Sequence, residues 1–208
     1  MAIGETSSRK SRVVGPVAAL AILLAASLLA ASGALSQVFL SRESALRTAF
    51  PGADEVVAHD LVLTPEEADR IASRAGAGAA LDSRLITAYE GRTGGESLGW
   101  ALIDTHTIRS LPQTVLVVIA PDGRIASTLL LAFHEPEQYR APARWFEQFR
   151  GLPLNRDLAV GRSVDGVSGA TMTSHSATAA ARRALAVWEE KLASPEVGLA
   201  AGIADSRS

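Results

Sequence analysis

The chain has 208 residues, a formal net charge of −2 and no block of Lys and Arg, which argues against a nucleic-acid partner. Its length suits one compact domain with an anchor or tail. With no cysteine, disulfides, Cys-bound iron–sulfur clusters and Cys-attached haem are excluded. The four histidines show no metal-ligand spacing, so we expect no metal site. An electron carrier of this composition would need an organic cofactor.

Residues 13–40 contain no charged side chain and follow the basic stretch 1–12. About 20 apolar or small residues suffice to cross a bilayer as a helix. We therefore predict a cytoplasmic tail over 1–12, a single transmembrane anchor over 13–40, and the remainder on the extracytoplasmic (periplasmic) side of the inner cell membrane. A cleaved signal peptide, with small residues near Ala31, is the alternative, and it leads to the same location.

The region that follows the anchor is expected to alternate short helices and strands. Thr64-Pro65-Glu66-Glu67 has a capping residue, a proline at the first helical position and acids in the first turn, which is typical of a helix start. In order, we expect a helix over 44–50, a turn at 51–52, a strand near 55–59, a helix from 65 to about 76, a strand over 85–89 and a hairpin-like turn at 94–95.

Residues 98–133 show the clearest β pattern, with apolar runs on either side of the turn Pro121-Asp122-Gly123. A helix broken or started at Pro142 is expected over 137–150, and a further helix over 174–192. The fold class is therefore α+β: an antiparallel sheet with flanking helices, preceded by one transmembrane helix. The domain is expected over 42–193, with its core at about 80–192 and a flexible tail over 194–208.

The stretch Asp165-Gly-Val-Ser-Gly-Ala-Thr-Met-Thr173 lies directly before the last helix. Gly166 and Gly169 permit backbone angles that other residues avoid, so the loop is tight and thin. The hydroxyls of the segment, together with the unpaired N–H groups and positive dipole end of the helix, suit a phosphate. Taken alone, a Ser- and Thr-rich helix start is also explained by simple capping.

The complete nine-residue pattern resembles the flavinylation motif of the FMN-binding domain family, found in the small membrane-anchored subunits of the Rnf and Nqr redox complexes. That motif is Asp, small, aliphatic, Ser or Thr, Gly or Ala, Ala, Thr or Ser, any residue, then Thr or Ser. The resemblance covers about residues 80–190 and matches 42–80 only loosely. It implies FMN attached covalently, through a phosphoester, to the last hydroxyl residue, which is Thr173.

The resemblance also implies the residues around the cofactor. His134 and Glu135 end the last strand and resemble a His-and-acid stretch near the flavin, although the family's downstream glycine is missing; a solvated loop is the alternative. No catalytic residue is expected. The complete set of predicted cofactor-binding residues is Thr173, Asp165, Gly166, Ser168, Gly169, Ala170, Thr171, Ser174, His134 and Glu135.

Maturation is expected to need a partner. A Thr hydroxyl is a poor nucleophile without a base or metal, and nothing beside Thr173 in the sequence obviously supplies one. The resemblance implies a separate, magnesium-dependent flavin transferase that uses FAD, as well as redox partner proteins at the membrane.

Four aromatic side chains stand out elsewhere. Trp145, Phe146 and Phe149 fall on one helical side, which predicts a core position rather than flavin contact. Trp100 has two open interpretations, stacking on the flavin or filling the core.

Polar side chains outside the motif also allow several interpretations. His106 and Arg109 lie at the cofactor pocket, on a partner-facing edge, or on a wet strand face. The pair Ser174-His175 suggests a nucleophile and base, but neighbours on a helix point in different directions and no Gly-x-Ser-x-Gly context exists. A hydrolase is therefore not expected.

The sequence thus predicts a membrane-anchored extracytoplasmic electron carrier that uses covalent FMN. Two alternatives remain open at this stage. One is a flavin-dependent reductase that acts directly on a small substrate, with His134 as proton donor. The other is a non-redox scaffold without flavin.

Overall fold

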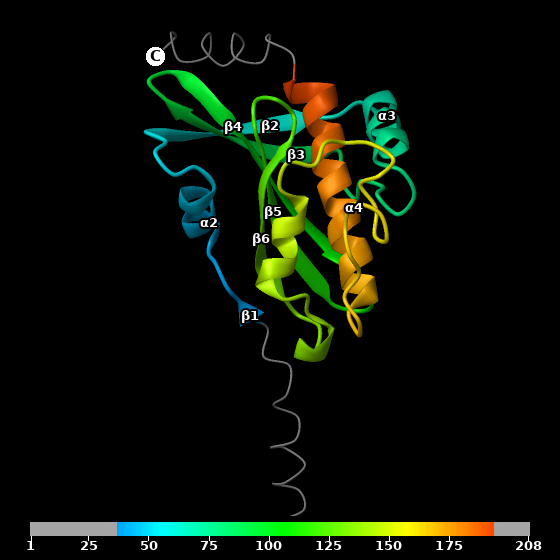
Figure 1. Cartoon of the computed structure of the whole chain (residues 1–208). Coiled ribbons are helices and arrows are strands. Elements are labelled where there is room, and N and C mark those ends of the chain that lie inside the picture. Colours follow the sequence, from blue (N-terminus) through cyan, green and yellow to red (C-terminus); the bar gives the residue numbers. More distant parts are fainter. Residues whose placement is uncertain (1–36, 194–208) are drawn as a thin grey trace, which may run out of the picture. The chain divides into compact units, whose positions relative to one another are not determined.

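The computed structural model describes residues 37–193, in which six strands form one antiparallel sheet (Figure 1). The strand order is β1-β6-β5-β4-β3-β2. The strands are β1 (Gln37–Val38), β2 (Glu55–Val62), β3 (Leu85–Thr93), β4 (Glu96–Thr107), β5 (Pro112–Ile119) and β6 (Ile125–Phe133). The helices are α2 (Arg42–Ala49), α3 (Pro65–Ala75), α4 (Thr171–Val187), the 3₁₀ helices η1 (Glu137–Tyr139) and η2 (Ala143–Phe149), and the π-helical turn η3 (Trp188–Leu192). The predicted antiparallel sheet with flanking helices is confirmed.

Helices cover both faces of the sheet, and each face has its own apolar core. The larger core joins the sheet to α3, α4 and η2, and the smaller core joins it to α2. Side chains alternate between the two along β4: Trp100 and Leu102 lie in the α4-side core, and Ala101 lies in the α2-side core. Successive apolar residues of this strand therefore contribute to the cores on opposite faces of the sheet.

The predicted hairpin turns are confirmed, and glycine enables them. Gly94 and Gly95 join β3 to β4 with φ of 57° and 87°, the left-handed angles that a two-residue hairpin turn needs. The β5–β6 connection contains Gly123 at φ 78°. These short connections keep neighbouring strands antiparallel and adjacent.

Helix α3 begins as its sequence predicts and is then fastened to η3. The Thr64 side chain accepts a hydrogen bond from the Glu67 N–H while the Glu67 side chain accepts from the Thr64 N–H, a capping box. Ion pairs link Glu67 to Lys191 at 2.6 Å and Arg70 to Glu190 at 2.6 Å. These ion pairs hold η3, which continues α4 at its C-terminal end, against α3.

Two helix predictions need correction. Residues 137–150 form the two short 3₁₀ helices η1 and η2 instead of one α-helix, because Pro142 lacks an N–H and holds the residue before it extended. Helix α4 begins at Thr171, three residues earlier than the predicted start at Ser174. Thr173 therefore lies inside the first helical turn.

The predicted transmembrane anchor lies largely outside the described residues, as does the predicted tail over 194–208. Its last residues are described: Gln37–Val38 form β1 and pair with Phe133 and Ala132 of β6. Within residues 37–193, no helix is both long and apolar enough to span a membrane.

Candidate functional site

The loop that precedes α4 is anchored to the core through η2. The Trp145 indole N–H donates to the Asp165 carbonyl oxygen at 2.6 Å, and the Asp165 N–H donates to Gln148 Oε1 at 2.9 Å. Trp145 is buried and meets Phe146 and Phe149 edge-on, so the predicted core position of these aromatics is confirmed. The backbone of Asp165 is fixed, while its side chain faces solvent.

The two motif glycines have different roles. Gly169 has φ 81°, and a Cβ placed there would meet no atom within 4 Å, so the backbone angle alone favours glycine. Gly166 is outside the left-handed region, contrary to the expectation that both glycines supply unusual angles. A Cβ at Gly166 would lie 3.4 Å from Val160 Cγ1, an ordinary close contact. Only Gly169 is required by its backbone conformation.

The first turn of α4 has no side-chain cap. Ala170 occupies the N-cap position, is almost fully buried, and makes no capping hydrogen bond. The N–H groups of residues 171–173 accordingly have no hydrogen-bond partner in the described part of the chain. Capping therefore does not explain the hydroxyls of this segment, and the helix start presents free donors.

The Ser174 hydroxyl closes the motif loop. It accepts a hydrogen bond from the Val167 N–H at 3.1 Å and donates to the Ala170 carbonyl at 3.1 Å. Ser174 is fully buried, and both of these bonds go to loop backbone rather than to His175. Its position supports a structural role for this hydroxyl.

The Thr173 hydroxyl is held by η1. The side chain is 1% exposed, and its Oγ1 donates to the Tyr139 carbonyl oxygen at 2.6 Å. Its neighbours Thr171 and Met172 are exposed. Of the two threonines, the one at the end of the motif points inward and the other points to solvent.

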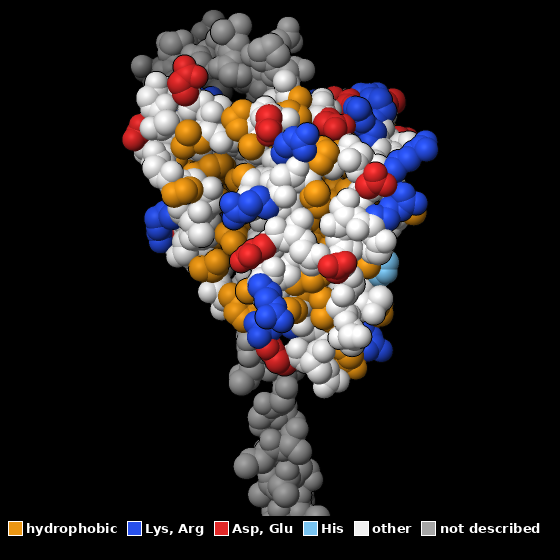
Figure 2. All heavy atoms as spheres, viewed as in Figure 1, with side chains coloured by type: hydrophobic (Ala, Val, Ile, Leu, Met, Phe, Trp, Pro, Cys, Tyr) orange, Lys and Arg blue, Asp and Glu red, His pale blue; other side chains and the backbone are white. Residues whose placement is uncertain are grey.

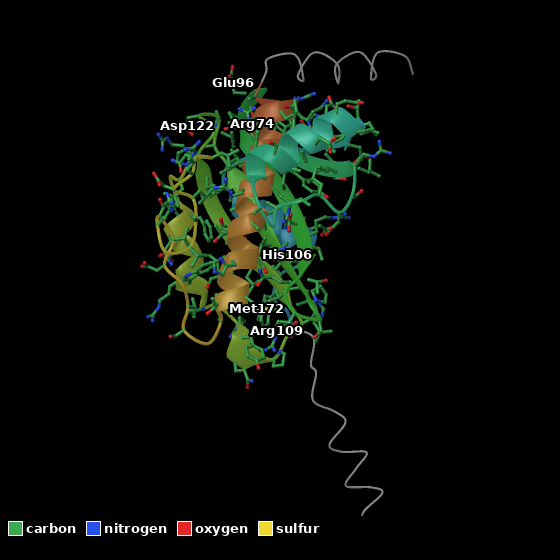
Figure 3. The ribbon with its side chains drawn as sticks, turned by 90° about the vertical axis from the view of Figure 1, so that its right-hand side faces the viewer. Arg74, Glu96, His106, Arg109, Asp122 and Met172 are labelled. Carbon is green, nitrogen blue, oxygen red and sulfur yellow. The ribbon has the colours of Figure 1, made fainter. Side chains whose placement is uncertain are left out.

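A cavity of about 150 Å³ borders the Thr173 side chain. Its walls come from the motif, from Tyr139, and from Ile108 and Arg109 in the connection between β4 and β5. Met172 and Arg109 lie close together at the foot of α4 (Figure 3). The Arg109 guanidinium sits 4.9 Å from the centre of the Tyr139 ring. Hydrogen bonds from Gln138 and Arg109, in that order, lower the pKa of the Tyr139 phenol.

Glu135 lies behind this cavity rather than in its wall. Its Oε1 accepts hydrogen bonds from the N–H groups of Arg109, Ser110 and Leu111 at 3.1, 2.8 and 2.9 Å. These bonds, led by the one from Ser110, hold the pKa of the buried Glu135 carboxyl below its usual value. Glu135 thus fixes the turn that carries Arg109.

His134 stands one residue earlier and is half-buried. Its backbone N–H donates to the Pro112 carbonyl at 3.1 Å, and its side chain is not part of the wall of the 150 Å³ cavity. His134 therefore does not line this cavity, and its predicted cofactor contact and its alternative role as proton donor to a small substrate stay predictions.

A buried polar network that the sequence did not reveal lies farther along α4. Arg183 donates to both oxygens of Asp104 at 2.8 and 2.7 Å, and Asp104 also bonds His106 Nδ1 at 2.6 Å. The His106 Nε2 lies 3.1 Å from Gln113 Nε2. His106 is 8% exposed and so does not lie on a wet strand face.

The charges of this network compensate one another. Burial raises the pKa of Asp104, but the hydrogen bonds from Arg183 and His106 outweigh it and lower that pKa to about 2. The signal in the sequence was an arginine, Arg183, among the alanines of the last helix, where burial demands an acidic partner. Trp100 packs against His59 with the ring centres 4.9 Å apart and is buried, which favours its core interpretation.

Residues 110–186 match the family model described as the FMN-binding domain. The matched segment runs from the end of the Arg109 turn through β5, β6 and the loop into α4, and includes all ten predicted cofactor-binding residues. No curated protein matches the chain.

Proposed function

Because residues 110–186 form a domain of the FMN-binding family, we propose that this protein is an electron carrier whose FMN is joined to Thr173 by a phosphoester. A bound flavin supplies the redox chemistry, and the chain positions it and controls its surroundings. The observation that carries the assignment is the setting of one hydroxyl. Thr173 borders a cavity at an uncapped helix start and is the last residue of the motif.

The surroundings of Thr173 fit a phosphate. Three backbone N–H groups at residues 171–173 have no partner within the described chain, and the helix dipole favours negative charge at this end by about 0.3–1 kcal/mol. Arg109 adds a cation in the same cavity wall. An anion tethered at Thr173 would therefore meet donors and positive charge.

The cavity is too small for the ring system of a flavin. At about 150 Å³ it has half the volume at the lower end of the 300–1,000 Å³ typical of small-molecule sites. We infer that the cavity takes the phosphate end and that the ring lies at the protein surface. An exposed ring suits a carrier, because redox partners can approach it.

Attachment requires a local rearrangement. The Thr173 hydroxyl is buried and donates its hydrogen to Tyr139. A phosphoester at the same oxygen removes that hydrogen, so the bond to the Tyr139 carbonyl is lost and η1 must move aside. The covered hydroxyl also supports a role for a flavin transferase: no Asp, Glu, Lys or His side chain lines the cavity to activate it.

Location outside the cytoplasm remains part of this proposal and rests on the uncharged run 13–40 after a basic N-terminus. A covalent bond would retain the cofactor there, where free FMN is lost by dilution. A reporter that works only outside the cytoplasm, fused after Ser208, should be active. Activity of a cytoplasmic reporter alone at that site would contradict the proposed topology.

Peptide mass mapping tests the attachment site. The full chain, coproduced with a flavin transferase, should gain an FMN-sized mass on the peptide containing Thr173. Thr173→Ala should give a folded, colourless protein, whereas Thr173→Ser should retain some flavin because a hydroxyl survives. Thr171→Ala removes an exposed hydroxyl of the same motif and can lower loading through the loop, so loss of flavin in that variant alone does not move the attachment site. Flavin localised on Thr171 or Ser174, with Thr173 unmodified, would refute the assignment.

A further inference from the structure

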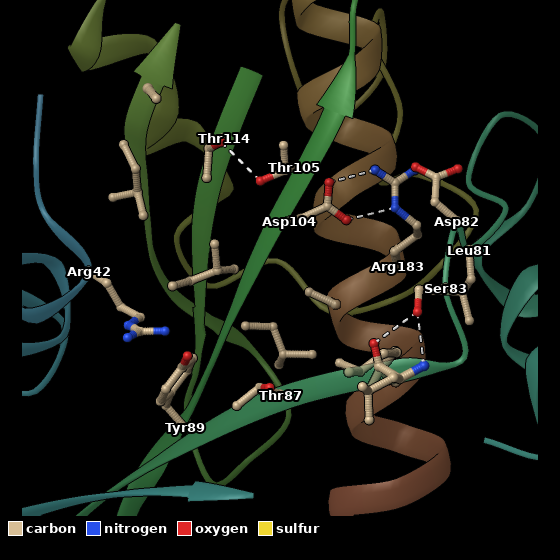
Figure 4. Close-up of a pocket in the computed structure, with 18 of the residues that line it drawn as sticks. Arg42, Leu81, Asp82, Ser83, Thr87, Tyr89, Asp104, Thr105, Thr114 and Arg183 are labelled. Carbon is tan, nitrogen blue, oxygen red and sulfur yellow. Dashed lines mark hydrogen bonds and ion pairs between the residues drawn. The ribbon is translucent and has the colours of Figure 1, made fainter. Parts of the chain in front are cut away.

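A second, larger cavity of about 650 Å³ lies where β3 separates from β4 (Figure 4). Pairing between these strands ends at Ala88 and Leu102. Beyond that point residues 85–87 pair with β2 and residues 103–107 pair with β5, so the strand edges that face each other are open. We call this space the β3–β4 groove. Its walls offer backbone donors and acceptors as well as side chains.

The groove has charged and polar groups at its ends and a mixed polar and aliphatic lining. Arg42 and Tyr89 lie at one end, and Asp82 lies at the other, near Arg183 (Figure 4). Within the described chain, the Arg42 guanidinium, the Tyr89 hydroxyl and the Asp82 carboxylate have no hydrogen-bond or ion-pair partner. The rest of the lining is mixed: it includes the aliphatic side chains of Leu85, Ile86, Leu102 and Ile103 and the hydroxyl-bearing side chains of Thr87, Thr105 and Thr114.

The side chains that line the groove indicate which class of ligand it could bind. The volume lies within the range of sites that hold small organic molecules. The aliphatic part of the lining favours a ring without charge. The cation and hydroxyl at one end, and the carboxylate at the other, favour oxygen atoms at opposite ends of that ring. A quinol or quinone has this arrangement, with a carbonyl that accepts from Arg42 or Tyr89 and a hydroxyl that donates to Asp82.

Val38 and Leu40 add two apolar side chains to the lining of the groove. A charged metabolite from solution would gain little from the aliphatic lining.

The groove and the Thr173 site are joined by two continuous elements. On β4, Asp104 lines the groove and His106 bonds Asp104, and Ile108, directly after β4, lines the cavity at Thr173. On α4, Arg183 follows Thr173 by ten residues, or about 15 Å of helix. The polar network thus lies between the two cavities.

We propose that the β3–β4 groove binds the ring of a membrane-soluble quinol that donates electrons to this protein. The electron-transfer part rests on the proposed function, because it requires FMN on Thr173. The quinol becomes the quinone as its two O–H bonds break, releasing two electrons and two protons. An FMN held at Thr173 would accept the two electrons and two protons, so atoms and charge balance.

Binding is tested on the full chain produced without a flavin transferase, with its unmodified mass confirmed. Titration calorimetry with a short-chain, water-soluble 1,4-naphthoquinone should show one site. Thr87→Phe places a ring in the groove and should weaken binding by about tenfold or more. Arg42→Ala removes an exposed cation without touching the core and should also weaken binding. Arg47→Ala, on the same helix but outside the groove, should leave the affinity unchanged.

Two results would overturn the groove assignment: no binding of the quinone, or binding that both Thr87→Phe and Arg42→Ala leave unchanged. The second result would place the quinone elsewhere on the protein even if Thr87→Phe were poorly folded, because Arg42 is exposed. Since the chain carries no flavin in this experiment, its outcome is independent of the attachment site.

Electron delivery is tested separately on the flavin-loaded chain. Under anaerobic conditions the reduced naphthoquinone should bleach the flavin absorbance, and Arg42→Ala should slow the bleaching relative to Arg47→Ala. Loaded protein that binds the quinone yet shows no bleaching, or equal rates in the two variants, would overturn the donor role. A chain that binds quinone in the groove but never acquires FMN would instead refute the proposed function.

Discussion

Single side chains at the candidate site divide into those that present an oxygen and those that shape its surroundings. Thr173 presents a hydroxyl. Ser174 and Glu135 hold the loop and the neighbouring turn, because their side-chain oxygens accept hydrogen bonds from backbone N–H groups, and Gly169 supplies the backbone angle of the loop. This division matters for mutagenesis, because losing a shaping residue lowers flavin loading without removing the acceptor.

Gly169 provides a test of the loop's backbone conformation. Gly169→Val should cost about 1–2 kcal/mol, because φ 81° brings a branched Cβ into conflict with its own backbone, and flavin loading should fall. Gly169→Asn is the matched variant, since Asn tolerates this region best among side chains. Loading measured by flavin absorbance should rank wild type, then Asn, then Val. Equal loading in all three would show that the transferase ignores this angle.

Glu135 provides a test of the turn that carries Arg109. Glu135→Gln places an amide opposite three N–H donors and removes a charge-assisted set of bonds, so we expect a loss of roughly 1.5–3 kcal/mol in the free energy of unfolding. Urea unfolding measures it. Glu137→Gln, an exposed position two residues on, is the control and should change stability little. A Glu135→Gln loss no larger than the control's would contradict the anchoring role.

Among the elements, η1 is the one whose position depends on the state of Thr173. It covers the hydroxyl, and its short 3₁₀ turn has few bonds of its own, namely Tyr139 N–H to Pro136 O at 2.9 Å and Arg140 N–H to Glu137 O at 3.0 Å. Helix α4, by contrast, is buried along most of its length and cannot shift without opening the larger core. Displacement at the site therefore falls on η1.

Hydrogen exchange tests this displacement. The amides of Tyr139 and Arg140 should exchange faster in flavin-loaded protein than in unloaded protein, because loading breaks the Thr173–Tyr139 bond. Amides of β5, which lies in the sheet centre, should be unaffected and serve as the internal control. Unchanged exchange in η1 after complete loading would mean that the phosphoester is accommodated without moving this segment.

Across the fold, charge is distributed rather than concentrated. On the face seen in Figure 2, basic and acidic side chains lie interspersed, in keeping with the net charge of −2. Among the charged side chains that lie largely inside the fold, Asp104 and Arg183 form an ion pair at 2.7 Å that ties the centre of the sheet to α4. Its loss affects the packing of the whole domain.

The pH dependence of stability should report this pair. The folded-state pKa of Asp104, about 2, is below its model-peptide value of 3.8, so its contribution is present above pH 4 and is lost as pH falls toward 2. Between pH 5 and pH 2, wild type should lose roughly 2 kcal/mol more than Asp104→Asn. Urea unfolding at several pH values measures the difference. Parallel pH profiles would show that Asp104 does not carry it.

Much of the fold could be predicted from the sequence. The hairpin turns at Gly94-Gly95 and Gly123, the Thr64 helix start and the alternating strands depend on preferences that act within a few residues. The motif also indicated which hydroxyl ends the loop. The predictions failed where a proline or a helix start shifted the local geometry, as in η1, η2 and the first turn of α4.

Contacts between residues far apart along the chain could not be predicted from the sequence. Thr173 meets Tyr139 across 34 positions, and Arg183 meets Asp104 across 79. In the sequence, His106 is an ordinary polar residue on a predicted strand, and only the folded structure shows that it is buried. The β3–β4 groove exists only because β3 turns toward β2 while β4 stays with β5. Short-range preferences set each element and the motif, but the packing of elements sets which side chains are buried together, and no local pattern encodes it.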